Sequence, residues 1–427
     1  MQFRAVKGTF DVLPDEVGRW QRLEQAFRST VELHGYSEVR TPVIELMDLF
    51  VRSVGETTEM VEKQMFTFPR SDEVIALRPE GTAGVARAYV ARSVHAREPV
   101  TRWYYLGPMF RAEQPQRGRY RQFHQAGCEV YGDAGPHTDA EMIDMLVGFL
   151  GSIGIQQVRV LVNCLGGAGT RERYRQALEA HFRPKAEQLS DHAKKRLDDN
   201  PLRILDSKNP KDIEASAGAP SILDLLEPED KAHWDGLRAA LDALGTPYEV
   251  SPTLVRGLDY YTRTLFEIQG ASGELGSQNA LLGGGRYDRM VKELGGPEVP
   301  AIGFAMGLER LLLAMPEKAP PKPPLVFVAP LGDRARSEAL KLGRELRAAG
   351  LTVEVDARGN SMKSMLRRSD GLGARVALVL GDSEIDQGTV QLKDLAQHTQ
   401  AAVPRAELLD RLKAALAAEA PAGGESR

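Results

Sequence analysis

Charged, amide and aromatic side chains alternate along residues 110–131, which read F-R-A-E-Q-P-Q-R-G-R-Y-R-Q-F-H-Q-A-G-C-E-V-Y. We predict a hairpin here, with one strand from about Trp103, a polar turn at Gln114–Tyr120 and a returning strand from about Arg121. Side chains on a strand point to alternate faces, so the odd-numbered positions share a face. Odd positions of the two predicted strands and of the first residues of the turn include Arg111, Glu113, Arg121, Phe123, Gln125 and Glu129.

The residue types on this face favour a site for a flat, charged ligand. Phe123 stands among the charges, Gly127 leaves a gap in the row, and the turn holds Arg117 and Arg119. The alternative is a solvated strand face laced with ion pairs, which is the commoner arrangement for charged strands. The even positions point the other way, so we expect Cys128 to face the core as a small apolar residue.

A carboxylate, a glycine and a hydroxyl stand at the end of a second predicted hairpin. Residues 65–77 alternate as M-F-T-F and V-I-A-L around a P-R-S-D-E turn, and the second strand runs into R-P-E-G-T at 78–82. A helix is predicted from about Ala83, so Thr82 is either its N-cap or a ligand contact. A cap does not require Glu80. A carboxylate beside exposed backbone could hold the ammonium group of a substrate.

Small residues precede a helix at residues 301–310, which read A-I-G-F-A-M-G-L-E-R. Gly303, Ala305 and Gly307 share strand parity, and small residues in such a row let a flat ligand approach the backbone closely. The predicted helix covers Leu308–Met315 and carries Arg310 in its first turn. A structural glycine bend does not explain an arginine at that place.

The elements that must position these residues divide the 427-residue chain into two or three domains. A helical pattern runs through Trp20, Leu23, Phe27, Val31 and Leu33 and ends at Gly35. The strand predicted after it contains Pro42, which cannot donate to a ladder and therefore indicates an edge or an interface. Further on we predict a helix at 137–155, a strand at Val158–Asn163, a polar helical stretch to about Leu244 and renewed sheet from Tyr248.

The predicted boundaries follow these patterns. They are 1–169 for the first part of the main domain, 170–245 for an inserted helical region, 246–316 for the second part of the main domain, 317–324 for a linker rich in proline, 325–416 for a compact α/β domain with a mixed sheet, and 417–427 for a disordered tail. The first part of the insertion is basic, and a solvated helix face accounts for that nearly as well as contact with nucleic acid.

Composition describes an ordinary globular protein, with 42% hydrophobic and 27% charged residues. Its 55 basic and 59 acidic residues give a net charge of −4, which argues against indiscriminate polyanion binding but permits a local basic surface. Cys128 and Cys164 match neither a zinc spacing nor a disulfide framework. The N-terminus has no apolar signal region and no apolar run has the length of a membrane span, so we expect a cytoplasmic protein with no membrane partner.

Taken together, the motifs resemble those of class II aminoacyl-tRNA synthetases, and among these the histidyl-tRNA synthetase family. The general class II features are Pro42 in the first motif, F-R-A-E at 110–113 in the second and G-L-E-R at 307–310 in the third. The strings G-R-Y-R-Q-F-H-Q (118–125), R-G-L-D-Y-Y (256–261) and G-G-G-R-Y-D (283–288) are characteristic of the histidine family. The resemblance covers nearly the whole chain.

The resemblance implies an α+β fold: a class II catalytic domain with an antiparallel sheet flanked by helices, a helical insertion and a C-terminal α/β anticodon-binding domain with a mixed sheet. It also implies a homodimer with Pro42 at the interface. The implied activity is that of an ATP-dependent histidine–tRNA ligase, which forms histidyl-adenylate and pyrophosphate and then transfers histidine to the 3′ end of tRNA(His). The implied partners are L-histidine, ATP with Mg²⁺ and tRNA(His), with no protein-bound structural metal.

The resemblance also distributes the site residues among three substrates. Histidine would be bound by Glu80, Gly81, Thr82, Arg111, Gln125, Glu129, Arg256, Tyr260, Tyr261 and Tyr287. ATP would be bound by Arg111, Glu113, Arg121, Phe123, Gly307 and Arg310, with Phe123 stacked on adenine and Arg310 at the γ-phosphate. The acceptor end of tRNA would contact Gln116, Arg117 and Arg119. Arg111 and Arg256 would be catalytic at the α-phosphate, the latter where other class II enzymes use a metal ion.

Three arginines without a Ser–His or Cys–His pair suit this chemistry, because adenylate formation needs positioning and charge neutralisation rather than a covalent enzyme intermediate. One alternative is a non-catalytic histidine-binding paralogue such as the regulatory subunit of ATP phosphoribosyltransferase, which would lack a domain such as 325–416 and several phosphate arginines. Another is a class II enzyme for threonine, proline or glycine, against which R-G-L-D-Y-Y argues. A pure RNA-binding protein would not need Phe123, Arg111 and Arg310 together.

Overall fold

The computed structural model describes residues 3–55, 58, 60–205, 207, 209–255, 260–270, 279–316 and 325–417, with only the backbone at Asp199. The chain forms two compact units, Met1–Pro320 and Pro321–Arg427. Among the described helices, none combines the length and the apolar character needed to cross a membrane.

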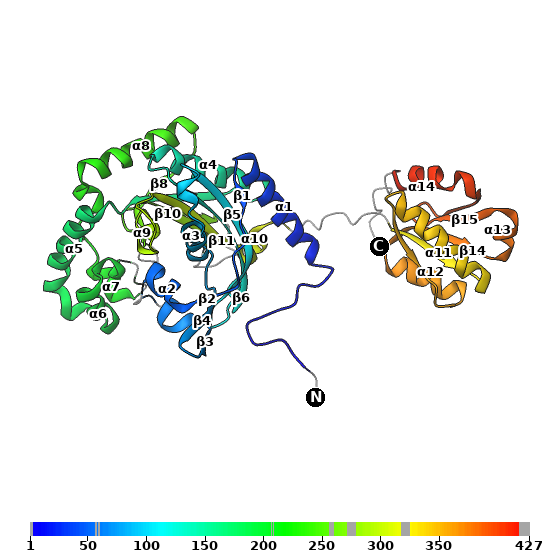
Figure 1. The fold of residues 1–427 in the computed structure, drawn as a ribbon, viewed down its shortest axis with the longest axis horizontal. Helices are drawn as coiled ribbons and strands as arrows, with labels where there is room; N and C mark the ends of the chain where they lie inside the picture. The colour runs from blue at the N-terminus through cyan, green and yellow to red at the C-terminus, as the bar shows by residue number, and fades with distance from the viewer. Residues whose placement is uncertain are drawn as a thin grey trace. The chain divides into compact units, whose positions relative to one another are not determined.

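An eight-stranded sheet forms the centre of the first unit (Figure 1). In sheet order its strands are β1 (Ser37–Glu38), β5 (Thr101–Phe110), β6 (Gln122–Tyr131), β11 (Ala301–Gly307), β10 (Ala280–Arg286), β9 (Thr262–Gly270), β7 (Val158–Cys164) and β8 (Glu249–Val250). All neighbours from β5 to β7 are antiparallel, and only the two-residue edge strands pair in parallel. The expected antiparallel sheet flanked by helices is confirmed.

Helices cover the even-numbered face of β6, which packs Ala126, Cys128 and Val130 into the largest core. The covering helices are α1 (Val17–Leu33), α4 (Pro136–Ser152), α8 (Pro228–Leu244) and α10 (Leu308–Ala314). In α1 the residues Trp20, Leu23, Phe27 and Val31 form the buried stripe that their helical spacing predicts. Leu33 was expected in this stripe but is 87% exposed, because two residues after Val31 the helix has turned away from the core.

The opposite, odd-numbered face meets a different set of elements. Tyr105, Met109 and Tyr131 of the hairpin lie in a second core together with α3 (Thr82–Ala91), α5 (Ala168–Phe182) and α9 (Met290–Glu293). Two further helices of the stretch 168–244 are α6 (Asp191–Asp199) and α7 (Pro210–Ala215), seen at the left of Figure 1. The even-numbered face of β6 therefore packs against one set of helices, and the odd-numbered face of the hairpin packs against another.

A small second sheet lies beside the first, in the order β2 (Ile44–Leu46), β4 (Glu73–Leu77), β3 (Thr67–Arg70), and the helix α2 (Met47–Val54) follows β2. The single strand expected around Pro42 is wrong. The chain leaves the large sheet after β1 and joins the small one at β2, with Pro42 in the link between them. Arg78 Nη1 donates to the carbonyls of Thr41 at 3.0 Å and Pro42 at 3.4 Å, so this link is held by side-chain bonds in place of a ladder.

The second unit has a mixed five-stranded sheet, as expected, in the order β13-β12-β14-β15-β16. Its elements are β12 (Leu325–Pro330), α11 (Asp333–Ala348), β13 (Thr352–Val355), α12 (Met362–Gly371), β14 (Ala374–Leu380), α13 (Asp382–Gln387), β15 (Thr389–Asp394), β16 (Thr399–Pro404) and α14 (Leu408–Ala417). The last helix, α14, begins at Leu408 after the 3₁₀ turn Arg405–Glu407. The exposed edge strand β16, T-Q-A-A-V-P, lacks the β-branched run by which strands are recognised.

Candidate active site

A cavity of about 640 Å³ opens on the odd-numbered face of the sheet. Strands β6, β10 and β11 form its base, and the segment before α3, the 114–120 turn and the start of α10 form its rim. The predicted site residues that line it are Glu80, Thr82, Arg111, Glu113, Arg119, Phe123, Gln125, Tyr260, Tyr261, Tyr287, Gly307 and Arg310. Residues separated by up to 230 positions are thus brought to one place.

Strand register explains why these side chains meet. In the pairing of β6 with β11, Gln125 is opposite Gly307 and Glu129 is opposite Gly303. Each long polar side chain therefore faces a residue without a side chain. A Cβ at Gly303 would overlap the Glu129 carboxylate and would stand 2.7 Å from the carbonyl oxygen of Cys128, so the glycine provides the space that this carboxylate occupies.

Directly behind the lining of the cavity lies a group of buried polar side chains. Glu129 is 0% exposed, and its Oε2 accepts a hydrogen bond from the Tyr287 hydroxyl. Burial raises the pKa of Glu129 well above its usual range, and it raises those of Tyr105, Tyr131 and Tyr287 in the same direction. Among the described residues, Glu129 Oε1 and the hydroxyls of Tyr105 and Tyr131 have no hydrogen-bond partner of normal geometry.

Tyr105 was missed in the sequence. It lies opposite Gly127 in the hairpin, and a Cβ at Gly127 would stand 2.5 Å from the Tyr105 hydroxyl. A Cβ at Gly81 would stand 2.5 Å from Cζ of the same ring. The gap expected over Gly127 is therefore filled by the side chain of Tyr105. An aromatic residue at an odd position of β5 was the available signal.

Glu80 and Gln125 bind the entrance of α3 to the cavity wall. Both oxygens of Glu80 accept backbone N–H groups, at 2.7 Å from Thr82 and 2.8 Å from Ala83, so the carboxylate caps the helix. Of the two roles considered for Thr82, the cap is therefore wrong, and Glu80, which a cap was not expected to require, accepts those N–H groups. Gln125 Oε1 accepts the N–H of Gly81 at 3.2 Å. Burial raises the pKa of Glu80, while the two backbone donors act against that rise.

Arg111 and Phe123 form one unit from the two arms of the hairpin. The guanidinium carbon of Arg111 lies 5.0 Å from the centre of the Phe123 ring, and Nε donates to the carbonyl of Pro79 at 2.9 Å. No described residue accepts a hydrogen bond from the two terminal nitrogens. Loss of water lowers the pKa of Arg111, although its side chain keeps contact with the cavity. The arginine is thus oriented at one end and available at the other.

The start of α10 closes the other side of the cavity. Arg310 Nη1 donates to the carbonyl of Ala280 at 2.8 Å, which connects the helix to β10. Glu309 accepts the backbone N–H of His124 at 2.8 Å and lies 3.1 Å from Nδ1 of that histidine. The hairpin strand and the helix are therefore joined next to Phe123.

Some predicted site residues lie elsewhere. Arg121 does not line the cavity, because its Nε and Nη1 donate to the backbone carbonyls of Glu113 at 3.3 Å and Lys7 at 3.4 Å. Gln116 and Arg117 stand on the exposed turn, where Gln116 and Arg119 form a backbone bridge. Gly81 contributes only backbone, through its bond to Gln125. Arg256 falls outside the described residues, as do the linker 317–324 and the tail 418–427.

A buried ion pair lies behind the site. Arg286 and Asp139 are both 0% exposed, with Arg286 Nη2 at 2.6 Å and Nε at 2.9 Å from the carboxylate. The Thr264 hydroxyl also donates to Asp139, and His233 Nε2 lies 2.9 Å from the same oxygen. The arginine of the string G-G-G-R-Y-D therefore connects β10 to α4, while the next residue, Tyr287, faces the cavity.

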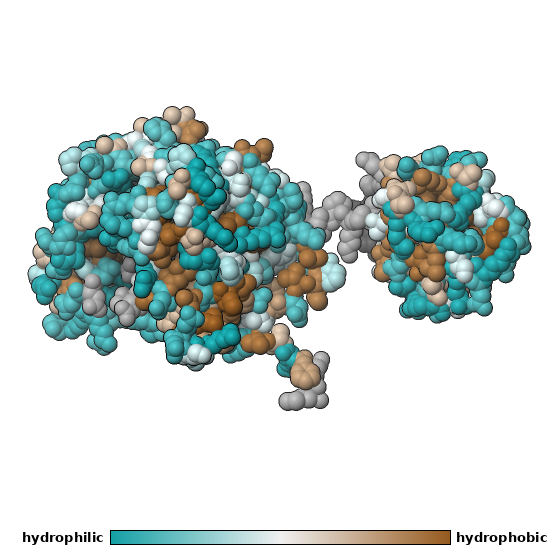
Figure 2. Space-filling model, viewed as in Figure 1, coloured by the Kyte–Doolittle hydropathy of each residue, from teal (hydrophilic) through white to brown (hydrophobic). Residues whose placement is uncertain are grey.

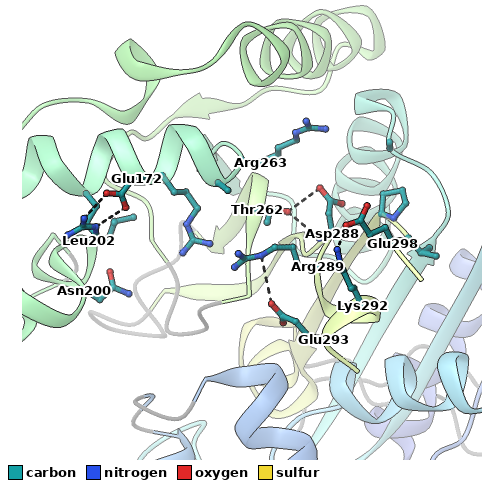
Figure 3. Close-up of a pocket in the computed structure, with 17 residues that line it drawn as sticks. Glu172, Asn200, Leu202, Thr262, Arg263, Asp288, Arg289, Lys292, Glu293 and Glu298 are labelled. Carbon is teal, nitrogen blue, oxygen red and sulfur yellow. Dashed lines mark hydrogen bonds and ion pairs between the residues drawn. The ribbon is translucent and has the colours of Figure 1, made fainter. Parts of the chain in front are cut away.

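A second cavity of about 890 Å³ lies between α5, the 3₁₀ turn Pro201–Ile204 and α9 (Figure 3). Its charged side chains are paired with one another, as in Glu172 with Arg175 at 2.6 Å and Arg289 with Glu293 at 3.8 Å. Lys292 is likewise paired with Glu298. The smaller cavity is the better candidate, because it is lined by most of the predicted site residues and by Arg111, whose terminal nitrogens have no acceptor among the described residues.

The composition of the site limits its chemistry. Within the described ranges, no group of three or more His, Cys, Asp or Glu residues could hold a metal ion. Both cysteines are buried thiols; burial raises the pKa of Cys164 to about 12 and that of Cys128 well above its usual range. Arginines, an aromatic ring and buried polar groups are the parts present, and these can bind and orient charged planar substrates.

The antiparallel sheet holds a hairpin that carries Arg111 and Phe123. The hairpin pairs with the glycine-containing strand β11, which leads into the helix of Arg310. This combination defines a class II aminoacyl-tRNA synthetase. Residues 8–311 match the family model described as histidyl-tRNA synthetase, and residues 325–415 match the anticodon binding domain. The chain belongs to the histidyl-tRNA synthetase family.

Relatives match over their whole length. The chain is 58% identical to the histidine–tRNA ligase of Sorangium cellulosum over 425 residues, which is 100% of this chain and 99% of the relative. It is 46% identical to that of Thermosynechococcus vestitus, covering 96% of both chains. The crystal structure of apo histidyl-tRNA synthetase from S. aureus superposes with a TM-score of 0.82 at 34% identity, covering 96% of this chain and 100% of that one.

Proposed function

We propose that this chain is an ATP-dependent histidine–tRNA ligase, which activates L-histidine as its adenylate and transfers it to the 3′ end of tRNA(His). Curated relatives that carry this activity in their names match the full chain. Two features carry the proposal: buried polar atoms of Glu129, Tyr105 and Tyr131 behind the cavity lining, which have no hydrogen-bond partner among the described residues, and the arginines that line the cavity itself. The first suits a small polar ring and the second suits phosphates.

These buried polar atoms form the proposed binding site of the histidine side chain. Imidazole has one nitrogen on each side of its ring, and among the described residues Glu129 Oε1 and the hydroxyls of Tyr105 and Tyr131 are buried polar atoms without a hydrogen-bond partner. A side chain without two ring nitrogens would leave those groups unpaired, which costs far more than the loss of an apolar contact. We assign Glu129, Tyr261 and Tyr287 to the imidazole and add Tyr105 to this set. Glu80, Gly81, Thr82 and Gln125 are assigned to the amino-acid backbone.

The arginines that line the cavity form the proposed ATP site. Arg111 carries its charge on two available nitrogens beside Phe123, so it can neutralise the α-phosphate while adenine lies on the aromatic ring. Arg310 is assigned to the γ-phosphate. A histidine carboxylate oxygen then attacks the α-phosphorus in line, the bond from that phosphorus to the bridging oxygen breaks, and pyrophosphate leaves with the electron pair. Arg256 is assigned a place beside both reacting groups by its motif alone.

In this scheme magnesium enters with ATP, as part of the substrate. The transfer step needs the terminal ribose hydroxyl of tRNA to reach the adenylate. Gln116, Arg117 and Arg119 are assigned to the acceptor end, because their exposed turn borders the cavity. The second unit is assigned to the anticodon.

A homodimer in the cytoplasm completes the proposal. The small sheet exposes large apolar side chains at Ile44 (55%), Leu46 (47%), Phe68 (51%) and Val74 (42%). Figure 2 shows apolar colour gathered over this part of the first unit. Adjacent exposed apolar side chains in a folded protein indicate an interface, and the link at Pro42 leads directly into this sheet.

The direct test is histidine-dependent ATP–pyrophosphate exchange, measured across a panel of amino acids. We expect exchange with histidine alone, and we expect the Arg111→Ala variant to lose it while keeping its fold. Arg92→Ala removes an exposed arginine that directly follows α3 and does not line the cavity, and it serves as the control. Binding of histidine without any exchange would favour the non-catalytic paralogue instead. That alternative is weakened by the presence of the second unit and of both described arginines.

A further inference from the structure

We propose that the N-terminal arm, residues 3–10, is part of the surface that receives the single-stranded acceptor end of tRNA. This inference rests on the proposed function, because it assigns a further segment to a substrate of the same site. The sequence F-R-A-V-K-G-T-F of the arm alternates apolar and basic residues. None of its side chains belongs to the cavity described above.

The arm is attached to the hairpin turn by main-chain bonds. The N–H of Arg121 donates to the carbonyl of Gly8 at 2.7 Å, and Arg121 Nη1 donates to the carbonyl of Lys7 at 3.4 Å. Gly8 has a φ of +89°, and a Cβ there would stand 2.8 Å from Cγ of Pro115 in the turn. The close approach and the backbone conformation both require glycine. The arm therefore has a defined place against the turn assigned to tRNA.

The attachment leads the arm to the mouth of the cavity. The ring of Phe10 lies 4.6 Å from that of Tyr120, and Tyr120 lines the cavity. A tight turn, in which the N–H and the hydroxyl of Thr9 both donate to the carbonyl of Val6, then carries the chain outward. A strand of nucleotides that leaves the cavity over Tyr120 would meet Phe10 first and then the residues before it.

The charge of this surface is strongly positive although the whole chain carries −4. The arm and residues 113–121 together hold five basic residues and one acid, Glu113, which pairs with Arg119 at 3.4 Å. Arg4 and Lys7 are exposed, and no described residue forms an ion pair with them. Arg121 donates to carbonyl groups rather than to a carboxylate. Unpaired cations side by side suit a chain of phosphates.

Exposed apolar side chains stand between these cations. Phe3 is 94% exposed and Val6 is 69% exposed, and Figure 2 shows the arm projecting from the lower edge of the first unit. Proteins that bind single strands combine a basic track with rings on which bases stack. A second copy of the chain could also cover Phe3 and Val6, but an apolar interface would not need the interleaved Arg4 and Lys7. The chemistry therefore favours RNA.

The test compares two double variants of the full-length protein. Arg4→Ala with Lys7→Ala removes both cations of the arm, and Arg92→Ala with Arg97→Ala removes the same charge from two exposed positions that follow α3. Histidine-dependent pyrophosphate exchange reports activation, and aminoacylation of tRNA at several salt concentrations reports the acceptor. We expect unchanged exchange in both variants. In the arm variant the slope of log KM for tRNA against log salt should fall by roughly 1.4 to 1.8, because each phosphate contact contributes about 0.7 to 0.9.

The same counterion release gives the size of the effect, a KM for tRNA raised roughly 14- to 30-fold at about 0.15 M salt. Phe3→Ala should raise KM further without changing the slope. An unchanged KM and slope in the arm variant would overturn the inference, and so would a loss of dimer mass in light scattering, which would make the arm a subunit contact. If the unmodified protein showed no exchange with histidine, the proposed function itself would fail, which is a different result.

Discussion

Gly303→Ala should disable recognition of histidine by displacing one carboxylate. A Cβ at this position would overlap Glu129 and stand 2.7 Å from its Cδ. Glu129 cannot retreat into solvent, since it is 0% exposed. The carbonyl of Cys128, also 2.7 Å from that Cβ, belongs to the backbone of β6 and cannot move without disturbing the ladder. One methyl group therefore acts directly on the bond between Glu129 and Tyr287.

The magnitude follows from what Glu129 would lose. A hydrogen bond to a charged group contributes about 1.5–3 kcal/mol, which corresponds to roughly 10- to 150-fold in affinity. We therefore expect KM for histidine to rise by at least tenfold in pyrophosphate exchange. KM for ATP should stay within about twofold, because Arg111 and Phe123 lie on the other part of the cavity.

Gly270→Ala is the matched control, because a Cβ there would make only ordinary contacts, the nearest at 3.5 Å from Leu281. Both glycines lie in strands of the same sheet. Thermal unfolding monitored by circular dichroism would establish that the Gly303→Ala variant is folded. A folded variant with normal KM for histidine would refute the reasoning, because the carboxylate would then have no role in binding or would tolerate displacement.

Three further predictions concern the buried groups. Tyr105→Phe should raise KM for histidine by roughly 2- to 12-fold, because one hydrogen bond is lost. Tyr104 lies on the other face of the strand, where its hydroxyl donates to Glu32, so Tyr104→Phe should leave KM unchanged. Equal effects of the two substitutions would remove Tyr105 from the site. Asp139→Ala should destabilise the first unit by about 3–5 kcal/mol in urea unfolding, because Arg286 would stay buried and uncompensated. The double variant with Arg286→Met should recover part of that loss, and no recovery would contradict a coupled pair. Burial raises the pKa of Glu129, so the stability that its protonated form contributes is present at low pH and is lost as the pH rises. Glu129→Gln should therefore raise the Tm of the ligand-free protein more at about pH 8 than at about pH 5. The same change in Tm at both pH values would contradict this prediction.

The alternation of side chains in 121–131 was sufficient to predict which face of β6 carries the site, because period two is a local property of a strand. Register between strands is not local, and this is why Tyr105 was missed and Gly127 was misinterpreted. The two residues are neighbours only once β5 and β6 pair. The role of Arg286 was equally hidden, since its partner Asp139 is 147 positions away. The capping role of Glu80 depends on where α3 begins, and helix boundaries are the least certain part of a sequence prediction.

The glycines of this site are best understood through the side chains opposite them. Gly303 makes room for Glu129, and Gly127 with Gly81 makes room for Tyr105, so each glycine is the complement of one buried polar group. Within the part of the chain that the structure describes, Glu129 Oε1 and the Tyr105 hydroxyl have no hydrogen-bond partner, and a buried polar atom left unpaired costs stability. The neighbouring ion pair of Arg286 and Asp139 is fully bonded and lies on the same strand, β10, that leads into Tyr287. The buried pair fixes the backbone of β10 at the residue before Tyr287, which limits how far the main chain can shift that tyrosine towards Glu129.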